Sequence, residues 1–387
     1  MPPRHIAFVT SLVPPARPQS GFAIANRAVV DGLRALGHRV SVVGAALPND
    51  EMPKEADTHV LTRMAIENAH VGAGTKLRWL AAALRHGVPY ASAKMIPVTN
   101  DAATRLDRVR PDVVVLNSYQ LATSVLRRRP FIYLAHNVES HTAAQNAAVG
   151  SGVEAMLYRR DARILRRLEN DLTDAAAWVW TLTAEDRDGF ALDADRCGTL
   201  PLIVPRTSRE RTAAKAFDIV LIGTWTWTAN AAGLRWFLEA VTPRLPPDFR
   251  VAVAGSVPRE LHGAHPRVNF LGRVEDAQGF LDQGHVVPLV ARGGTGVQLK
   301  TIEAFQCGRA TVATRSSLRG IGEPPPNCHV ADEPAAFALA LTEFVRRGRS
   351  GEAIDRDGTD FYEAQRAALH AALDRGVDRA MAAEGTM

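Results

Sequence analysis

A series of short apolar segments, mostly separated by helical patterns, constrains the fold of this chain more than any other feature. The segments are rich in β-branched residues and have the length of buried strands. They are Ile6–Val9, Val40–Val43, Val113–Leu116, Phe131–Leu134, Trp178–Leu182, Ile219–Ile222, Val251–Ala254, Val268–Leu271, Val286–Val290 and Thr311–Ala313. Parallel neighbours need a crossover long enough for a helix. The alternation therefore predicts an α/β fold with doubly wound parallel sheets.

The strand–helix–strand opening occurs twice, which predicts two domains. After the first strand, apolar residues from Phe22 to Leu36 recur every three or four positions, and Gly37 suits the left-handed position beyond a helix. A second opening starts at Phe217, with a helix predicted over Ala232–Val241. Between them, Leu200–Lys215 is proline-bearing and then charged, as in a linker.

The 387 residues suit two α/β domains of ordinary size. We assign residues 1–205 to an N-terminal domain and 206–351 to a C-terminal domain. Residues 352–387 are predicted to be a helical segment, for which a crossing back to the first domain is considered.

The strongest local signal is ARGGTGVQLKTIEAFQCGRATVAT, residues 291–314. Gly293, Gly294 and Gly296 follow a strand, and a helix is predicted over 297–306. Backbone N–H groups in such a turn approach an anion closely, and the helix N-terminus adds positive potential. Lys300 is placed to meet a diphosphate, and Glu303 to accept hydrogen bonds from ribose hydroxyls.

The plainer interpretation of this segment is a glycine-rich turn with a surface Lys–Glu pair. The glycine cluster at the carboxyl end of a strand favours a binding site. The spacing is not that of a Walker A loop.

This segment resembles the donor-binding signature of GT-B glycosyltransferases, especially the retaining family 4, also called group 1. There a glycine-rich loop leads to E-A-x-x-x-G-x-x-V, which this chain matches at Glu303, Ala304 and Gly308, with Thr311 at the position of the valine. The family usually carries a second glutamate eight residues earlier, where this chain has Thr295. It is similar here to the subgroup with a G-x-G-x-x-x-K loop.

Other pieces match the same family in order along the chain. Gly21 lies in a segment that resembles its first loop, and His136 ends FIYLAH, similar to a strand whose terminal histidine faces the reaction centre. Residues 166–190 resemble its helix–strand–turn segment. Gly223 and Asn230 are in register with the first loop of the donor domain.

The resemblance implies a GT-B fold, with two Rossmann-like domains facing across a cleft, and a hexosyltransferase-like enzyme. The N-terminal domain would lie on the acceptor side, and the C-terminal domain would bind the nucleotide sugar. It implies sugar transfer from a nucleoside diphosphate (NDP)-sugar with retention of configuration and no cofactor besides the donor. His136 would contact the donor sugar, and Lys300 and the glycine loop the diphosphate. The expected acceptors are a surface glycan, as in polysaccharide biosynthesis, a lipid carrier or a small metabolite.

Two other functions stay open. A nucleotide-sugar 2-epimerase has the same double fold but needs a pair of acid–base carboxylates, and the sequence shows no clear pair beside His136. A non-catalytic nucleotide-sugar binder is the other alternative, because the chain has Glu303 but not the second glutamate that the family usually carries.

No metal site is predicted. His136, Glu139 and His141 do not share one helical face, and no fourth ligand is evident. Asp193 and Asp195 imitate the D-x-D pair of another glycosyltransferase fold but suit an exposed turn near the linker.

The net charge of +5 fits a basic surface, a phosphorylated substrate or anionic lipid. Aromatic residues do not interleave with the basic clusters, so no nucleic-acid partner is expected. Residues 76–87, KLRWLAAALRHG, are interpreted as a packed amphipathic helix, with peripheral membrane contact as the alternative. No signal peptide, disulfide framework or membrane span is predicted, so a cytoplasmic location is expected.

Overall fold

The computed structural model describes residues 2–18, 20–55, 57–66, 71–126, 130–206, 215–226, 228–262, 265–293 and 296–384. The chain divides into two compact units. The first comprises residues 1–201 and 368–387, and the second residues 202–367. Half of the predicted linker, residues 207–214, lies outside the described residues.

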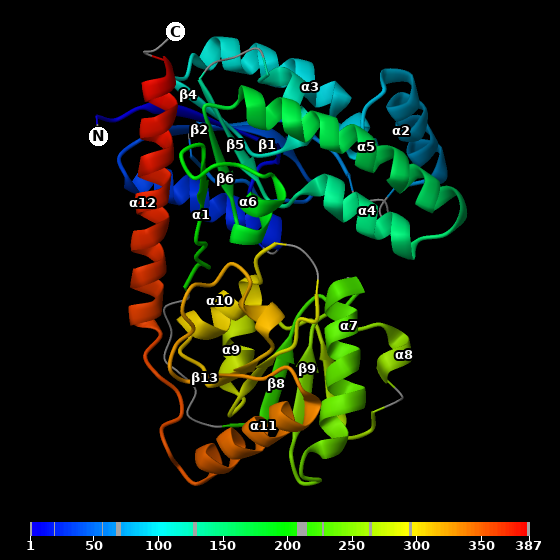
Figure 1. Cartoon of the computed structure of the whole chain (residues 1–387), viewed down its shortest axis with the longest axis vertical. Helices are drawn as coiled ribbons and strands as arrows, with labels where there is room; N and C mark the ends of the chain where they lie inside the picture. The colour runs from blue at the N-terminus through cyan, green and yellow to red at the C-terminus, as the bar shows by residue number, and fades with distance from the viewer. Residues whose placement is uncertain are drawn as a thin grey trace. The chain divides into compact units, whose positions relative to one another are not determined.

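The first unit is built on one parallel sheet of order β3-β2-β1-β4-β5-β6-β7 (Figure 1). Its strands are β1 (His5–Leu12), β2 (Arg39–Ala46), β3 (Thr58–Arg63), β4 (Val113–Leu116), β5 (Phe131–Ala135), β6 (Trp178–Thr181) and β7 (Cys197–Thr199). Its helices include α1 (Gly21–Ala35), α2 (Ala73–His86), α3 (Tyr90–Val109), the 3₁₀ turn η2 (Tyr119–Ser124), α4 (Glu139–Val149), α5 (Gly152–Ala175) and α6 (Ala184–Gly189). The predicted strands of this half are confirmed, and β3 and β7 were not predicted.

Helices cover both faces of this sheet. Apolar residues of α3 and α5, such as Val98 and Leu172, pack in one cluster with Val9 and Val114 of the strands. On α1, a Cβ at Gly32 would lie 2.6 Å from a methyl carbon of Leu373, so a larger residue there would require this side chain of α12 (Thr359–Glu384) to shift. The sheet is therefore doubly wound, as predicted.

The second unit has two parallel three-stranded sheets, β10-β9-β8 and β11-β12-β13, joined by an isolated parallel bridge between Ile219 and Val286. The strands are β8 (Ile219–Ile222), β9 (Val251–Ala254), β10 (Val268–Gly272), β11 (Val287–Leu289), β12 (Thr311–Ala313) and β13 (Cys328–Val330). Helical segments between them are α7 (Thr228–Trp236), the π turn η3 (Phe237–Val241), the 3₁₀ turn η4 (Thr242–Arg244), α8 (Arg259–His262), α9 (Ala277–Asp282), α10 (Leu299–Gln306), the 3₁₀ turn η5 (Arg315–Leu318) and α11 (Pro334–Arg349).

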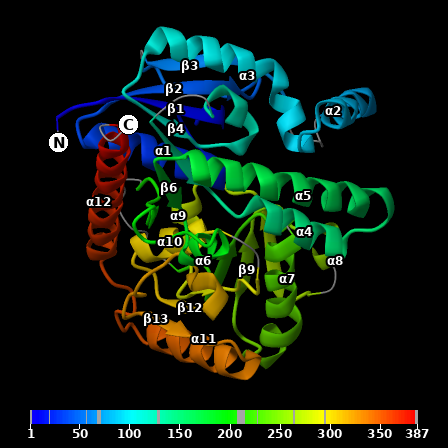
Figure 2. The same cartoon turned by 45° about the horizontal axis from the view of Figure 1, so that its top comes forward.

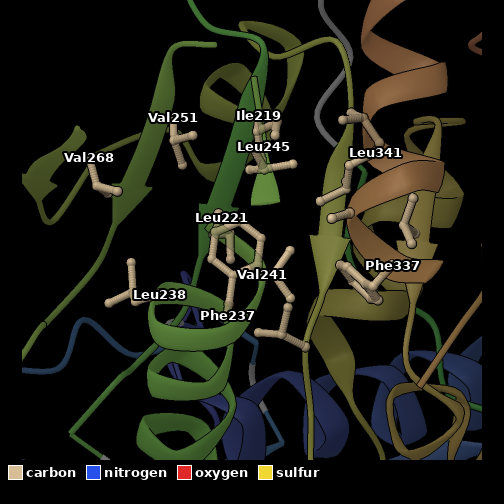
Figure 3. Close-up of a cluster of buried hydrophobic side chains, with 14 of the residues drawn as sticks. Ile219, Leu221, Phe237, Leu238, Val241, Leu245, Val251, Val268, Phe337 and Leu341 are labelled. Atoms are coloured by element: carbon tan, nitrogen blue, oxygen red, sulfur yellow. The ribbon is translucent and has the colours of Figure 1, made fainter. Parts of the chain in front are cut away.

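Two apolar layers hold this unit together. Figure 3 shows the first, in which Phe237 and Val241 of η3 and Phe337 of α11 lie against strand residues such as Leu221. The second layer packs Phe280 of α9 and Phe305 of α10 against the other face of the strands. The strand order, read along the chain, is that of a Rossmann fold.

Several local predictions hold in detail. Gly37, predicted to lie in the left-handed position beyond a helix, has a φ of 87° directly after the end of α1, and Gly308 has a φ of 64° after the end of α10. Helix α10 begins at Leu299, two residues later than expected.

No described helix has the length and apolar character needed to cross a bilayer.

Candidate functional site

The second unit has its topological switch point between β8 and β11. The chain goes to β9 on one side of β8 and returns to β11 on the other, so the loops beyond these two strands diverge. In open parallel sheets, ligands bind at this point, outside the carboxyl ends of the strands. Residues 223–227 follow β8, and residues 290–298 follow β11.

Lys300, in the first turn of α10, connects the two loops. Its Nζ donates to Oδ1 of Asn230 at 3.2 Å and lies 5.1 Å from the centre of the Trp225 ring. The Asn230 amide in turn donates to the Thr224 carbonyl at 3.0 Å. Burial lowers the pKa of Lys300 to about 8. Both contacts are with uncharged groups, so the ammonium would gain from an anionic ligand.

The glycines around Trp225 allow the tryptophan to lie against the end of the sheet. Trp225 is 1% exposed, and its indole N–H donates to the Ala254 carbonyl at 2.9 Å. A Cβ at Gly223 would lie 3.1 Å from the ring, and one at Gly255 only 1.8 Å from the Gly223 carbonyl oxygen. Gly223 therefore contacts the Trp225 ring. Lys300 in turn lies over this buried ring, which forms a rigid aromatic surface.

Glu303 lies on α10 one turn after Lys300. Its Oε1 accepts a long hydrogen bond, 3.5 Å, from the amide of Gln278 on α9, and that amide also donates to the Pro205 carbonyl at 3.0 Å. Burial raises the pKa of Glu303. A partly buried carboxylate with one long hydrogen bond keeps acceptor capacity for the two hydroxyls of a ribose.

The glycine loop is described in part. Gly296 has φ of 71°, which suits glycine, and the side chain of Gln298 makes no capping hydrogen bond to the start of α10. Gly293 is also described, whereas the predicted site residues Gly294 and Thr295 lie outside the described residues.

Glu303→Gln is expected to weaken binding of the NDP by about 1–3 kcal/mol, because a charged acceptor for ribose becomes a neutral one. Calorimetry on the folded variant measures this. Glu343→Gln, on the exposed side of α11 with a side chain 67% exposed, is the matched control. An unchanged dissociation constant for Glu303→Gln would remove this residue from the site.

The first unit places polar side chains at its own switch point, between β1 and β4. Thr10 lies in β1, Asn117 directly after β4, and His136 directly after β5. Nε2 of His136 is 2.8 Å from Oδ1 of Asn117, and Phe22 of α1 lies with its ring centre 4.9 Å from that of the imidazole. Burial lowers the pKa of His136 to about 4, so the ring is neutral at physiological pH.

Gly21, the other glycine predicted to bind the donor, is the first residue of α1. The preceding Ser20 caps this helix, with its hydroxyl accepting from the Ala23 N–H at 3.2 Å. Gly21 therefore lies at a helix N-terminus, where an anion is favoured.

At the start of α4, which follows His136 in the chain, the tertiary structure brings together two glutamates that the sequence did not pair. Glu169 of α5 accepts the backbone N–H of Glu139 at 2.6 Å, at the start of α4. Burial, reinforced by the negative charge of Glu169, raises the pKa of Glu139 to about 7. The sequence alone does not reveal this pair, because Glu139 and Glu169 are thirty positions apart on different helices.

No group of three or more His, Cys, Asp and Glu side chains suited to a metal occurs in the described part of the chain. Asp193 and Asp195 lie in an exposed turn before β7.

Trp225, Gln278 and Asn117 contact the candidate site residues and were not singled out from the sequence. For Asn117 a signal existed, because it is a polar residue directly after a fully apolar strand. Trp225 and Gln278 carry no such signal, since both depend on loops or helices brought together by the sheet.

Comparisons with known proteins agree with this architecture. Residues 216–347 match the family model described as Glycosyl transferases group 1. This match confirms the predicted enzyme class, a glycosyltransferase. No curated protein sequence matches the chain at a significant level.

Solved structures match over nearly the whole chain. Anabaena HepE in complex with UDP-glucose has a TM-score of 0.63 at 13% identity, covering 97% of this chain and 99% of that one. Sucrose-phosphate synthase from Thermosynechococcus elongatus has a TM-score of 0.61 at 15% identity, covering 99% and 98%. At such low sequence identities, structural similarity establishes only the fold. The fold is GT-B, with two Rossmann-like domains.

Proposed function

We propose that this glycosyltransferase uses an NDP-sugar donor and binds it at the β8–β11 switch point of the second unit. The observation that carries the proposal is Lys300, held on Asn230 above Trp225 with a pKa lowered by burial to about 8. The solved structures of Anabaena HepE with UDP and with UDP-glucose support a uridine nucleotide as the first to test.

In this proposal each part of the site has one task. Lys300 and the N–H groups of residues 293–298 hold the diphosphate, whose negative charge grows as the sugar leaves. The carboxylate of Glu303 holds the ribose. Retention of configuration is proposed from the sequence resemblance, through a front-face reaction in which the acceptor hydroxyl attacks from the side of the departing diphosphate. No enzyme nucleophile is then needed.

Incubation with a panel of NDP-sugars tests the proposal. NDP release that depends on an added acceptor means transfer. An epimeric sugar nucleotide without NDP release means a 2-epimerase, the alternative that the Glu139–Glu169 pair favours, since acid–base chemistry needs such carboxylates. Binding without turnover would leave a nucleotide-sugar binder and contradict the proposed transfer.

Transfer is expected to proceed without a divalent metal ion. The departing diphosphate must be neutralised by a metal or by protein donors, and Lys300 with the glycine loop supplies the second solution. The measurement compares transfer in excess EDTA with transfer in added magnesium or manganese. Complete loss in EDTA, restored by metal, contradicts this account of the diphosphate site. Mild stimulation does not, because cations also speed release of the NDP.

For the acceptor side, we propose that the first unit docks on an anionic membrane at the cytoplasmic face, with a lipid-linked acceptor as the favoured class. The prediction that α2 packs its apolar side chains is wrong for Leu77 and Leu84, which are 70% and 57% exposed. The same helix carries Lys76, Arg78 and Arg85 and no acidic residue.

A second exposed apolar group lies beside α2. Val149, Val153 and Met156, where α4 passes into α5, are 78%, 72% and 63% exposed. Arg160, one turn further along α5, donates to the Ala83 carbonyl of α2 at 2.7 Å, which brings the two segments together (Figures 1 and 2). Exposed apolar side chains bordered by arginine and lysine complement the interface of an anionic bilayer.

Replacing Leu77 and Leu84 together with serine is expected to lower partitioning onto phosphatidylglycerol vesicles about 100-fold, since two leucines lose their burial in the bilayer. Co-sedimentation measures it, with phosphatidylcholine vesicles as the uncharged comparison. Leu339→Ser, which alters a leucine 70% exposed in α11 of the second unit, is the matched control. Equal binding of all variants, or none by the unaltered protein, would overturn the membrane proposal.

A further inference from the structure

We infer that Asn117 is a positioning residue that fixes His136 in the Nε2–H tautomer and leaves Nδ1 as a hydrogen-bond acceptor for a substrate hydroxyl. The tautomer follows from hydrogen bonds within the first unit alone. The role of Nδ1 as the acceptor for a hydroxyl of the donor sugar or of the acceptor molecule rests on the proposed function.

The direction of every hydrogen bond in the network is set at Thr10. Its hydroxyl lies 3.0 Å from the Leu12 carbonyl, which only accepts, so the single hydroxyl proton is used there. The Thr10 oxygen therefore accepts from the side-chain amides of Asn26, at 3.2 Å, and Asn117, at 3.1 Å.

The amide of Asn117 is oriented by the same contacts. Its nitrogen also donates to Oδ1 of Asn26 at 2.8 Å, so Oδ1 of Asn117 is the atom that meets His136. In the opposite orientation, with oxygen and nitrogen exchanged in both asparagine amides, their two oxygens and the Leu12 carbonyl would all face the single hydroxyl proton of Thr10. Thr10, Asn26 and Asn117 are 0%, 0% and 1% exposed, so water does not compensate the acceptors left without a donor.

Nε2 of His136 must then be the donor in its 2.8 Å contact with Oδ1 of Asn117. Burial keeps the imidazole neutral, with a pKa lowered to about 4. A neutral imidazole has one N–H, so Nδ1 carries a lone pair, and no described residue donates to it.

The chemical consequence concerns the role of His136. A ring in this state accepts a hydrogen bond from a hydroxyl and does not supply a proton to the departing diphosphate. Hydroxyls are abundant on both donor and acceptor sugars, so the network selects a polyol ligand over a carboxylate or phosphate at this position.

Nitrogen-15 NMR of histidine-labelled protein without ligand tests the tautomer, with His136→Gln used to assign the signals. His136 is expected to show the Nε2–H form, uncharged from pH 6 to pH 8. Asn117→Ala is expected to turn this single form into an exchanging mixture, whereas the signals of His5, whose Nε2 contacts Ser41, stay unchanged and report an intact fold. An Nδ1–H or charged ring in the unaltered protein overturns the inference, as does an unchanged single tautomer in Asn117→Ala. If Asn117→Ala does not fold, Thr10→Ala removes the same anchor and is judged by the same criteria.

Activity supplies the second readout. Asn117→Ala is expected to lower kcat/KM for transfer about tenfold, roughly the effect of one misplaced hydrogen bond, with unchanged affinity for NDP in the second unit. A mixed tautomer with full activity overturns the role toward substrate. The tautomer is read without substrate, so a failure of the proposed transfer reaction would leave that result standing.

Discussion

Lys300→Met is expected to lower the rate of sugar transfer about 100- to 1000-fold, the range found when a preorganised donor to a developing negative charge is removed. The methionine keeps the bulk beside the Trp225 ring but cannot neutralise a diphosphate. Affinity for the free nucleoside should change little. Steady-state transfer with parallel calorimetry of nucleoside and NDP measures both effects. Lys54→Met, at an exposed lysine of the first unit, is the control.

The same substitution is expected to stabilise the second unit. Burial lowers the pKa of Lys300 from 10.5 to about 8 in the folded state. Between these values the unfolded chain binds a proton that the folded chain has released, so stability rises with pH there, and below pH 8 the charged lysine is destabilising. Lys300→Met removes that cost, and its unfolding midpoint should rise at pH 7.

The activity of the unaltered enzyme should also depend on the protonation of Lys300. Its kcat/KM should fall as the pH rises through about 8, because the free enzyme loses the Lys300 cation. Intact turnover in Lys300→Met would falsify the assignment of Lys300 to the diphosphate. Equal loss of affinity for the nucleoside and for the NDP in this variant would contradict it as well.

Arg309→Met is expected to destabilise the second unit by about 3–5 kcal/mol, the usual effect of removing one partner from a buried ion pair. The Arg309 side chain is 1% exposed, with Nη1 2.5 Å from Asp355 and 3.7 Å from Asp282. Lys215, the other cation nearby, lies 3.6 Å from Asp355. Without Arg309, the carboxylates of Asp282 and Asp355 lose a buried cationic partner.

Thermal and urea unfolding, followed by fluorescence of tryptophans in each unit, measures the loss. Arg315→Met is the matched control, because Arg315 also pairs with an aspartate but its side chain is 83% exposed. Adding Asp282→Asn and Asp355→Asn to Arg309→Met should recover much of the stability, since the negative charges that faced Arg309 are then gone. If Arg309→Met and Arg315→Met unfold alike, the buried network does not stabilise this unit.

Features that depend on neighbours in the chain could be read from the sequence. The central strands are continuous apolar runs because both of their faces are covered. Gly37 and Gly308 follow helices at positions that require a positive φ. The glycine loop with Lys300 and Glu303 was recognised because a strand, a turn and a helix follow each other directly. These signals were enough to predict the α/β class, the double winding and the enzyme class.

Features that depend on distant segments were decided only by the tertiary structure. The strands β3, β7 and β13 were missed because they pair on one side only and are partly exposed, so their sequences mix polar and apolar residues. The Asn117–His136 contact, the Glu139–Glu169 pair and the Arg309 network each join residues that are far apart in the chain. Whether Leu77 is buried also depends on what packs over α2. Local sequence sets the periodicity of an element, whereas burial, pKa and hydrogen-bond direction depend on which other element covers it.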